Sequence, residues 1–335
     1  MPGRGAMRGR WLANRLLGAV CAALLTMPML TTPAAAEASP VAPSIAPSGT
    51  ASVTVRTVSD VRYAGVSRAQ VLDLHVPSAP SPVPLVVLVH GDDFAGGDKR
   101  NVLAVPTLLG RGFAVASVNY RLSGEARFPA AVQDVKAAIR WLRAHAGEYG
   151  IDPARFAVWG TSAGGYLATM AGVSGGVWSG LDDAGLGNAT VSAEVQAVVA
   201  WYAPADFAAM DTQARRVAAC TGRSPVHDDA SSAESRWLGA PVQSAPLLRA
   251  SDPVAWLPSV PRGRLPTFLL VHGSVDCSVP PGQSTQWGQA LAAVGAPVRV
   301  EIVEGAGHAD DVLHRRMLGP TADFLATALG RRAAG

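Results

Sequence analysis

The chain has 335 residues, of which 49% are hydrophobic and 16% charged, so it can bury the core of one large domain or two small ones. Its formal net charge is +3, but four arginines lie within the first fifteen residues, and no basic cluster elsewhere favours nucleic acid as a partner. Beyond the N-terminus, no apolar run is long and uncharged enough to span a bilayer.

Residues 1–36 have the three parts of a secretory signal peptide. The arginines of MPGRGAMRGRWLANR precede the apolar stretch LLGAVCAALLTMPML, and TTPAAAEA supplies small residues for cleavage after Ala36. A membrane anchor is the alternative, but the apolar stretch is short. Lipidation of Cys21 would need a small residue before it, and Val20 stands there. We therefore expect secretion of a mature chain of 299 of the 335 residues with net charge −1, since four arginines leave with the signal.

The segment 37–50, EASPVAPSIAPSGT, is rich in Pro, Ala and Ser, which predicts a flexible linker. The remaining residues, 51–335, alternate short apolar runs with amphipathic ones. The apolar runs predict strands within 51–64, 69–76, 84–90, 112–120, 155–160, 196–203, 265–273 and 297–305. The amphipathic runs predict helices over 128–150, 163–173, 283–295 and the C-terminal end.

Continuous apolar strands that alternate with helices are typical of the α/β class, with a mostly parallel sheet covered on both faces. The segment 204–262 interrupts this alternation. It has many Ser, Pro, Ala and charged residues and no sustained period, so we expect an inserted cap or a long loop there.

The sequence GTSAGG, residues 160–165, contains the pattern G-x-S-x-G between a predicted strand and a predicted helix. The pattern alone is weak, but this context is that of a nucleophile elbow, in which Ser162 sits on a sharp, strained turn. Gly160 and Gly164 would leave room where the strand and the helix crowd each other. The N–H of Ala163 would then point at a developing oxyanion.

A serine nucleophile needs a base, and the base needs an acid that orients it. Asp276 follows the apolar run 265–273, and His308 follows the next run, 297–305. With Ser162, all three would lie at the C-terminal edge of the sheet, in the chain order Ser, acid, His. The plainer alternatives are a structural serine in a turn, a solvated loop acid and a surface histidine. Because Ser162, Asp276 and His308 are all expected at the same edge of the sheet, a catalytic role is favoured over these alternatives.

The other histidines and the nearby acids receive no chemical role. His90 and His272 end apolar strands and are expected to brace loops by hydrogen bonds. Asp310 and Asp311 are expected to begin the last helix. The remaining histidines have no comparable placement: His75, His145, His227 and His314.

Cys220 and Cys277 are left when Cys21 leaves with the signal peptide. In an oxidising compartment, an even pair predicts a disulfide; two buried free thiols are the alternative. Such a bridge would tie the segment 204–262 to the loop of Asp276 and hold a cap over the site. A metal site would need more ligands close by, so no metal and no cofactor is expected.

Six stretches, in order over most of residues 70–310, together resemble an α/β-hydrolase esterase of the bacterial feruloyl- and acetylxylan-esterase-like (BD-FAE-like) branch, with hormone-sensitive-lipase relatives. They are HGDDFAGGDK, VASVNYRLSGEARFPAAVQDVKAAIRWL, YGIDPARFAVWGTSAGGYLA, SSAESRWLGAPV, LLVHGSVDCSVPPGQS and EGAGHAD. The resemblance implies an α/β-hydrolase fold and a triad of Ser162, Asp276 and His308. It also implies that Gly91, Asp92 and Ala163 supply the N–H groups of an oxyanion hole.

The stretch HGDDFAGGDK departs from the family pattern, in which three small residues, usually glycines, follow the histidine. Only Gly91 keeps to it, because Asp92 and Asp93 replace the others. Three interpretations remain open. The carboxylates point to solvent and the hole works; or they bind a hydroxyl or an amine of the substrate; or they oppose the oxyanion and impair catalysis.

These observations favour a secreted serine carboxylic-ester hydrolase that forms an acyl-enzyme on small acyl or aryl esters or on esterified polysaccharide fragments. A serine peptidase of the prolyl-oligopeptidase type is one alternative, although about 50 residues before the first strand leave no room for a propeller. A hydrolase fold retained for ligand binding is another, with the altered loop as its mark.

Overall fold

The computed structural model of the chain describes residues 54–261 and 263–330. The predicted signal peptide, 1–36, and the predicted linker, 37–50, lie outside the described residues. Within them, one eight-stranded sheet has the order β1-β2-β4-β3-β5-β6-β7-β8. Strands β3 to β8 are parallel, and β1 and β2 are antiparallel to their neighbours. The strands are β1 Val55–Arg62, β2 Val71–Pro77, β3 Val83–Val89, β4 Ala114–Val118, β5 Ile151–Thr161, β6 Ala197–Trp201, β7 Thr267–Gly273 and β8 Val298–Val303.

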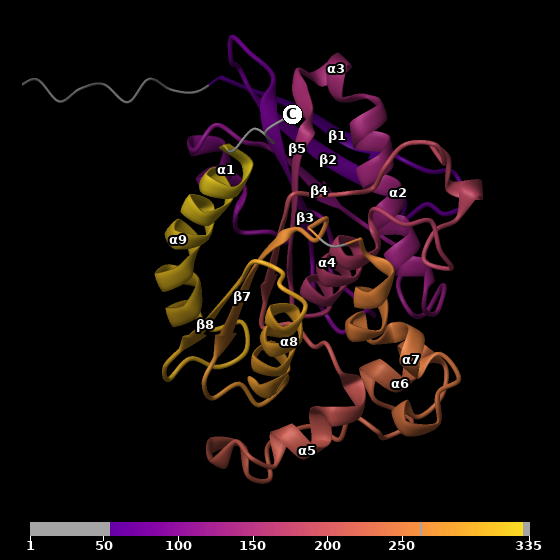
Figure 1. Cartoon of the computed structure of the whole chain (residues 1–335), viewed down its shortest axis with the longest axis vertical. Helices are drawn as coiled ribbons and strands as arrows, with labels where there is room; N and C mark the ends of the chain where they lie inside the picture. Colours follow the sequence, from indigo (N-terminus) through magenta and orange to yellow (C-terminus); the bar gives the residue numbers. More distant parts are fainter. Residues whose placement is uncertain (1–53, 262, 331–335) are drawn as a thin grey trace, which may run out of the picture. The chain divides into compact units, whose positions relative to one another are not determined.

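Alternate residues of the central strands belong to two separate hydrophobic cores, one on each face of the sheet. In β3, Leu85 and Val87 lie in one core, whereas Val86 and Leu88 lie in the other. Helices α2, α4 and α8 cover the first face, and α1 and α9 cover the second (Figure 1). The predicted α/β class is confirmed. The helices are α1 Val105–Gly110, α2 Ala130–Ala144, α3 Ala146–Tyr149, α4 Ala163–Ser174, α8 Gly282–Ala293 and α9 Asp311–Gly330.

Two local features differ from the sequence prediction. The helix expected over 128–150 is divided into α2 and α3 at His145. The backbone N–H of His145 still donates to the carbonyl oxygen of Trp141, and its Nδ1 atom lies 2.8 Å from the same oxygen, so His145 caps the end of α2 with both its backbone and its side chain. Helix α1 was not predicted, because its six residues are too few to show a helical period.

Residues 204–261 join β6 to β7 through short helical pieces instead of one regular element. These are η2 Phe207–Ala209, α5 Met210–Ala214, η3 Ala218–Cys220, α6 Ala233–Leu238, η4 Val242–Ser244, α7 Leu248–Ser251 and η5 Pro253–Ser259. Trp237 of α6 anchors the segment, because its fully buried ring stacks on Phe94 at 4.3 Å and meets Tyr166 edge-on. The inserted segment is therefore packed against the loop that follows β3.

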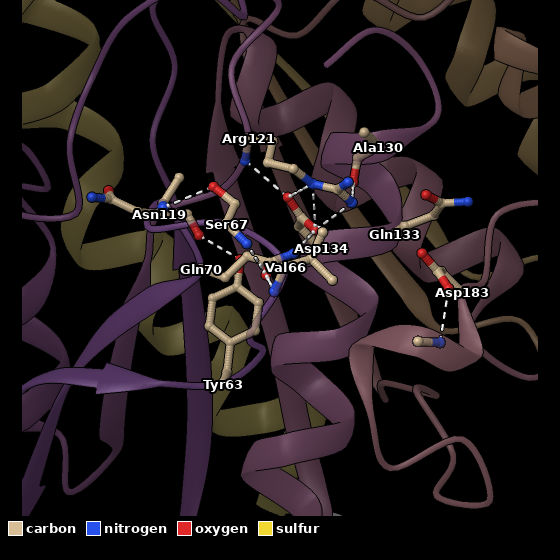
Figure 2. Close-up of polar contacts among 12 residues, drawn as sticks. Tyr63, Val66, Ser67, Gln70, Asn119, Arg121, Ala130, Gln133, Asp134 and Asp183 are labelled. Atoms are coloured by element: carbon tan, nitrogen blue, oxygen red, sulfur yellow. Dashed lines mark hydrogen bonds and ion pairs between the residues drawn. The ribbon is translucent and has the colours of Figure 1, made fainter. Parts of the chain in front are cut away.

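A buried polar network fixes the loop that follows β4 (Figure 2). Asp134 of α2 is fully buried, and its carboxylate accepts hydrogen bonds from the Gln70 side chain and from the backbone and guanidinium of Arg121. The hydroxyl of Tyr63 donates to the carbonyl of Asn119 at 2.7 Å. Because a buried charge must be paired and fully hydrogen-bonded, this network holds residues 119–121 in one position beside the β3 loop.

Candidate active site

Ser162 lies on the sharp turn between β5 and α4. Its backbone angles, φ 52° and ψ −125°, are strained for a residue with a side chain. The glycines around it show why the turn is possible. A Cβ atom on Gly160 would lie 2.0 Å from the carbonyl oxygen of Gly164, and a Cβ on Gly164 would lie 2.2 Å from that of Val89. The strand and the helix therefore meet at a distance that only glycine allows.

Ser162, His308 and Asp276 come together although 146 and 32 residues separate the hydrogen-bonded partners. The Oγ atom of Ser162 lies 3.0 Å from Nε2 of His308, and Nδ1 of His308 lies 2.7 Å from Oδ2 of Asp276. The carboxylate can only accept, so Nδ1 carries the hydrogen and Nε2 is free to accept the serine proton. The three predicted residues thus have the geometry of a nucleophile, a base and an orienting acid.

The carboxylate of Asp276 is fully buried and has four hydrogen-bond donors. Its Oδ1 atom accepts from the N–H groups of Ser278 and Val279, each at 2.9 Å, and its Oδ2 atom lies near both His308 and His272. Burial raises the pKa of Asp276, but the hydrogen bonds from His272 and His308 have the larger combined effect. They lower the pKa below its ordinary value, to about 2. The group is therefore an anion at neutral pH.

His272 is fully buried and braces the loop after β7. Its Nε2 atom lies 2.9 Å from the carbonyl oxygen of Val279 and 3.3 Å from Oδ2 of Asp276, while Nδ1 lies 2.7 Å from the hydroxyl of Ser284. The bracing role predicted from the sequence is present, and the contact with the acid is additional. His90 braces the β3 loop in a similar way, since its Nδ1 atom lies 3.0 Å from the carbonyl oxygen of Gly91 and its ring stacks on Tyr120.

Cys220 and Cys277 form the predicted disulfide. Cys277 directly follows Asp276, and Cys220 ends the short helix η3 of the inserted segment. The bridge thus ties the insertion covalently to the loop that carries the acid.

The loop after β3 has an unusual backbone, with positive φ at Asp92 (85°), Asp93 (54°) and Phe94 (58°). Asp tolerates such angles better than most residues, and the buried ring of Phe94 holds the loop in the aromatic cluster of Trp237. A Cβ atom on Gly91 would lie 2.7 Å from the carbonyl oxygen of Thr161, so the loop passes directly beside the serine turn.

The N–H groups of Asp92 and Ala163 make no hydrogen bond within residues 54–261 and 263–330. The side chains of Asp92 and Asp93 are exposed, and Oδ2 of Asp92 lies against the backbone of Gly96. The two backbone donors are therefore available to an oxyanion, and both exposed carboxylates also line the cavity that holds Ser162.

A cavity of about 860 Å³ is lined by Ser162, His308 and the β3 loop, and also by residues of the insertion between Pro225 and Arg236. Much of its wall is polar. Hydroxyl and amide groups come from Asn101, Ser231 and Ser278, and the charged side chains are Asp92, Asp93, Asp229, Glu234 and Arg236, with the imidazoles of His90, His227 and His308 beside them. A cavity of this composition suits a polar substrate better than a long alkyl chain.

Comparison with known proteins identifies the family. The sequence profile of the BD-FAE family matches residues 72–291, which is more than half of the chain. The chain belongs to the BD-FAE family. The resemblance that the sequence motifs carry is therefore confirmed.

Relatives of this BD-FAE chain include esterases. Esterase LipC of Mycobacterium tuberculosis is 28% identical over 280 residues, which are 80% of this chain and 63% of LipC, so the chain spans less than two thirds of that relative. A bifunctional GH43-CE protein of Bacteroides eggerthii superposes with a TM-score of 0.72 at 30% identity, over 82% of this chain and 35% of that protein. A truncated carbohydrate esterase from gut microbiota superposes with a TM-score of 0.71 at 28% identity, over 82% of this chain and 97% of that esterase. These matches confirm the α/β-hydrolase fold.

Several residues of the BD-FAE chain's cavity received no role from the sequence. His227 and Glu234 lie on the wall because the insertion folds back over the sheet edge. Tyr202 meets the ring of His308 edge-on at 4.8 Å, and its hydroxyl lies 3.1 Å from Nε2 of His314. A polar residue within an irregular segment carries no periodic signal. For Glu234, the one available signal was its place in the matching stretch SSAESRWLGAPV.

In the part of the BD-FAE chain that the structure describes, no cluster of three or more His, Cys, Asp or Glu side chains is arranged to hold a metal ion. No helix among the same residues has both the length and the apolar character that a membrane crossing requires.

Proposed function

We propose that the chain is a serine carboxylic-ester hydrolase in which Ser162, His308 and Asp276 form the catalytic triad. The observation that carries this proposal is the pair of hydrogen bonds at His308, 3.0 Å to the Ser162 hydroxyl and 2.7 Å to the Asp276 carboxylate. Membership of the BD-FAE family and the esterase relatives support the same reaction class.

The reaction follows from this geometry in two halves. The Oγ atom of Ser162 attacks the acyl carbon while its proton passes to Nε2 of His308, and Asp276 stabilises the resulting imidazolium. The N–H groups of Asp92 and Ala163, with Gly91 beside them, bind the oxyanion of the tetrahedral intermediate. His308 then protonates the departing alcohol, and a water molecule, activated by the same histidine, hydrolyses the acyl-enzyme.

The substrates that we propose are small acyl or aryl esters, including esters of carbohydrate fragments. The polar wall of the cavity supports a polar alcohol part, and two similar solved structures are a GH43-CE protein and a carbohydrate esterase. We also propose that the protein is secreted. The arginine-rich start, apolar stretch and small-residue site of residues 1–36 support this location.

The test is hydrolysis of p-nitrophenyl acetate and butyrate by the parent and by Ser162→Ala, with Ser78→Ala as a matched control in an exposed loop away from the cavity. We expect Ser162→Ala to lose at least about 1,000-fold in kcat/KM and Ser78→Ala to match the parent. Turnover retained by Ser162→Ala would disprove the proposed nucleophile.

The altered loop is tested by Asp92→Gly in the same assay. Loss of an oxyanion donor lowers the rate by about 100- to 1,000-fold. The backbone N–H survives this substitution, so we expect a change of less than about tenfold. A parent without turnover that becomes active as Asp92→Gly would show that the carboxylate impairs or redirects ester chemistry, and a ligand-binding function would then take precedence.

A further inference from the structure

A second polar pair lies on the wall of the active-site cavity, formed by Glu234 and His227 of the insertion. Both residues are buried, with 8% and 3% of their surface exposed. The Nδ1 atom of His227 lies 3.2 Å from Oε1 of Glu234. A carboxylate is seldom buried to this extent without a specific partner or a specific use.

The backbone around this pair is held at both ends. The N–H of His227 donates to Oδ1 of Asp211 at 2.7 Å, and its carbonyl accepts from the hydroxyl of Ser232, also at 2.7 Å. The same hydroxyl oxygen caps α6 by accepting from the N–H of Ser235. Glu234 follows this cap within the first turn of α6. The pair is therefore preorganised before any ligand arrives.

The pair also retains unused hydrogen-bonding capacity. Within the described residues, no hydrogen bond reaches Oε2 of Glu234, and Nε2 of His227 is buried without a partner. A helix-terminal acid that only favours the helix dipole would be equally effective at the surface. A buried carboxylate on a cavity wall, with one oxygen held by histidine and the other unpaired, suits a ligand that donates a hydrogen bond.

The neighbouring wall indicates which donor fits. The side chains of Asn101, Ser231 and Ser278 line the same cavity. Hydroxyl and amide groups both donate and accept. They complement the hydroxyls of a neutral polyol, which also donate and accept. The carboxylates of Asp92 and Asp229 on the same wall would also attract an ammonium group, so the test below includes an ammonium ester as a contrary outcome.

We propose that Glu234, held in place by His227, determines specificity by accepting a hydrogen bond from a free hydroxyl on the alcohol part of the ester. The favoured substrates are then monoesters of sugars that keep a free hydroxyl next to the acylated one. This inference rests on the proposed ester hydrolysis and adds the group by which the alcohol is recognised.

The test compares two acetyl esters, methyl 3-O-acetyl-β-xylopyranoside and its 2,4-di-O-methyl derivative, which has the same ester but no free hydroxyl. The readout is the ratio of their kcat/KM values in the parent, Glu234→Met and Glu234→Gln. Glu148→Gln, an exposed acid on α3, is the matched control. We expect the parent to prefer the free-hydroxyl ester by at least about tenfold. The ratio should fall to within about threefold in Glu234→Met, be intermediate in Glu234→Gln and stay at the parent value in Glu148→Gln.

A parent without preference, or a Glu234→Met variant with the parent's ratio, would overturn the inference. So would a Glu234-dependent preference for acetylcholine over the sugar ester, because that ligand has an ammonium group and no hydroxyl. Binding separates this inference from the proposed function. In Ser162→Ala, titration calorimetry should find the free-hydroxyl ester bound at least about tenfold more tightly than after Glu234→Met is added. That difference in a parent without turnover would contradict the proposed hydrolysis and leave the recognition standing.

Discussion

Asp276→Asn should reduce the stability of the protein in a manner that depends on pH. The pKa of Asp276 is about 2 in the folded protein, against its ordinary value of 3.8. One pKa unit corresponds to about 1.4 kcal/mol, so the ionised carboxylate contributes about 2 kcal/mol of folding free energy at pH 7. Because the folded pKa is the lower one, this contribution is present above the unfolded pKa and is lost as the pH falls, with about half of it gone by pH 3.

Urea unfolding of the parent and of Asp276→Asn at pH 7, 5, 4 and 3 measures this contribution directly. Other carboxylates titrate in both proteins, so the informative quantity is the difference in unfolding free energy between them. We expect that difference to shrink by about 1 kcal/mol between pH 7 and pH 3. A difference that stays constant or grows would refute the assignment of a stabilised anion at Asp276. The same variant should lose activity by about 10,000-fold, as serine triads do when this acid becomes an amide.

Three further changes follow from the packing around the site. Replacing Cys220 and Cys277 by serine removes a link across 57 residues and should lower the unfolding free energy by about 2–4 kcal/mol in urea titrations, and an unchanged midpoint would contradict the structural role of the bridge. Phe94→Ala should lower the unfolding free energy by about 3–5 kcal/mol and also lower kcat, because it removes a ring from the aromatic cluster under the β3 loop. A stable, fully active variant would show that the loop does not depend on that cluster. Gly164→Ala should abolish folded protein in thermal melts, because its Cβ would overlap a backbone oxygen, whereas Gly319→Ala in α9, where space is open, should not lower Tm. Equal melting of these two glycine variants would argue against the close approach at the elbow.

The positions of Ser162, Asp276 and His308 could be predicted because Ser162 directly follows an apolar strand, and Asp276 and His308 lie in the loops just after two others. Parallel strands collect their C-terminal ends at one edge, so strand order alone brings such residues together. The same reasoning predicted a mostly parallel sheet covered by helices on both faces. Both predictions rest on the period of apolar residues along the chain and on the rule that parallel strands end at one edge of a sheet.

What the sequence did not reveal depends on contacts between distant, irregular segments. The stack of Trp237 on Phe94 and the placement of Glu234 on the wall of the cavity that holds Ser162 both arise when the insertion folds back onto the β3 loop. The contact of His272 with Asp276 depends on the exact path of the loop after β7. Tertiary packing decides such contacts, and no local pattern reports them.

The most direct test of Ser162 as the nucleophile is reaction of the protein with diethyl p-nitrophenyl phosphate, followed by peptide mass spectrometry. Attack by a serine Oγ forms an O–P bond and expels p-nitrophenolate, which leaves a stable diethylphosphoryl group on the nucleophile. We expect one adduct per chain, on Ser162, that is absent from Ser162→Ala and forms much more slowly in His308→Asn. An adduct on another residue, or none in a protein that hydrolyses p-nitrophenyl acetate, would contradict the assignment of Ser162 as the nucleophile.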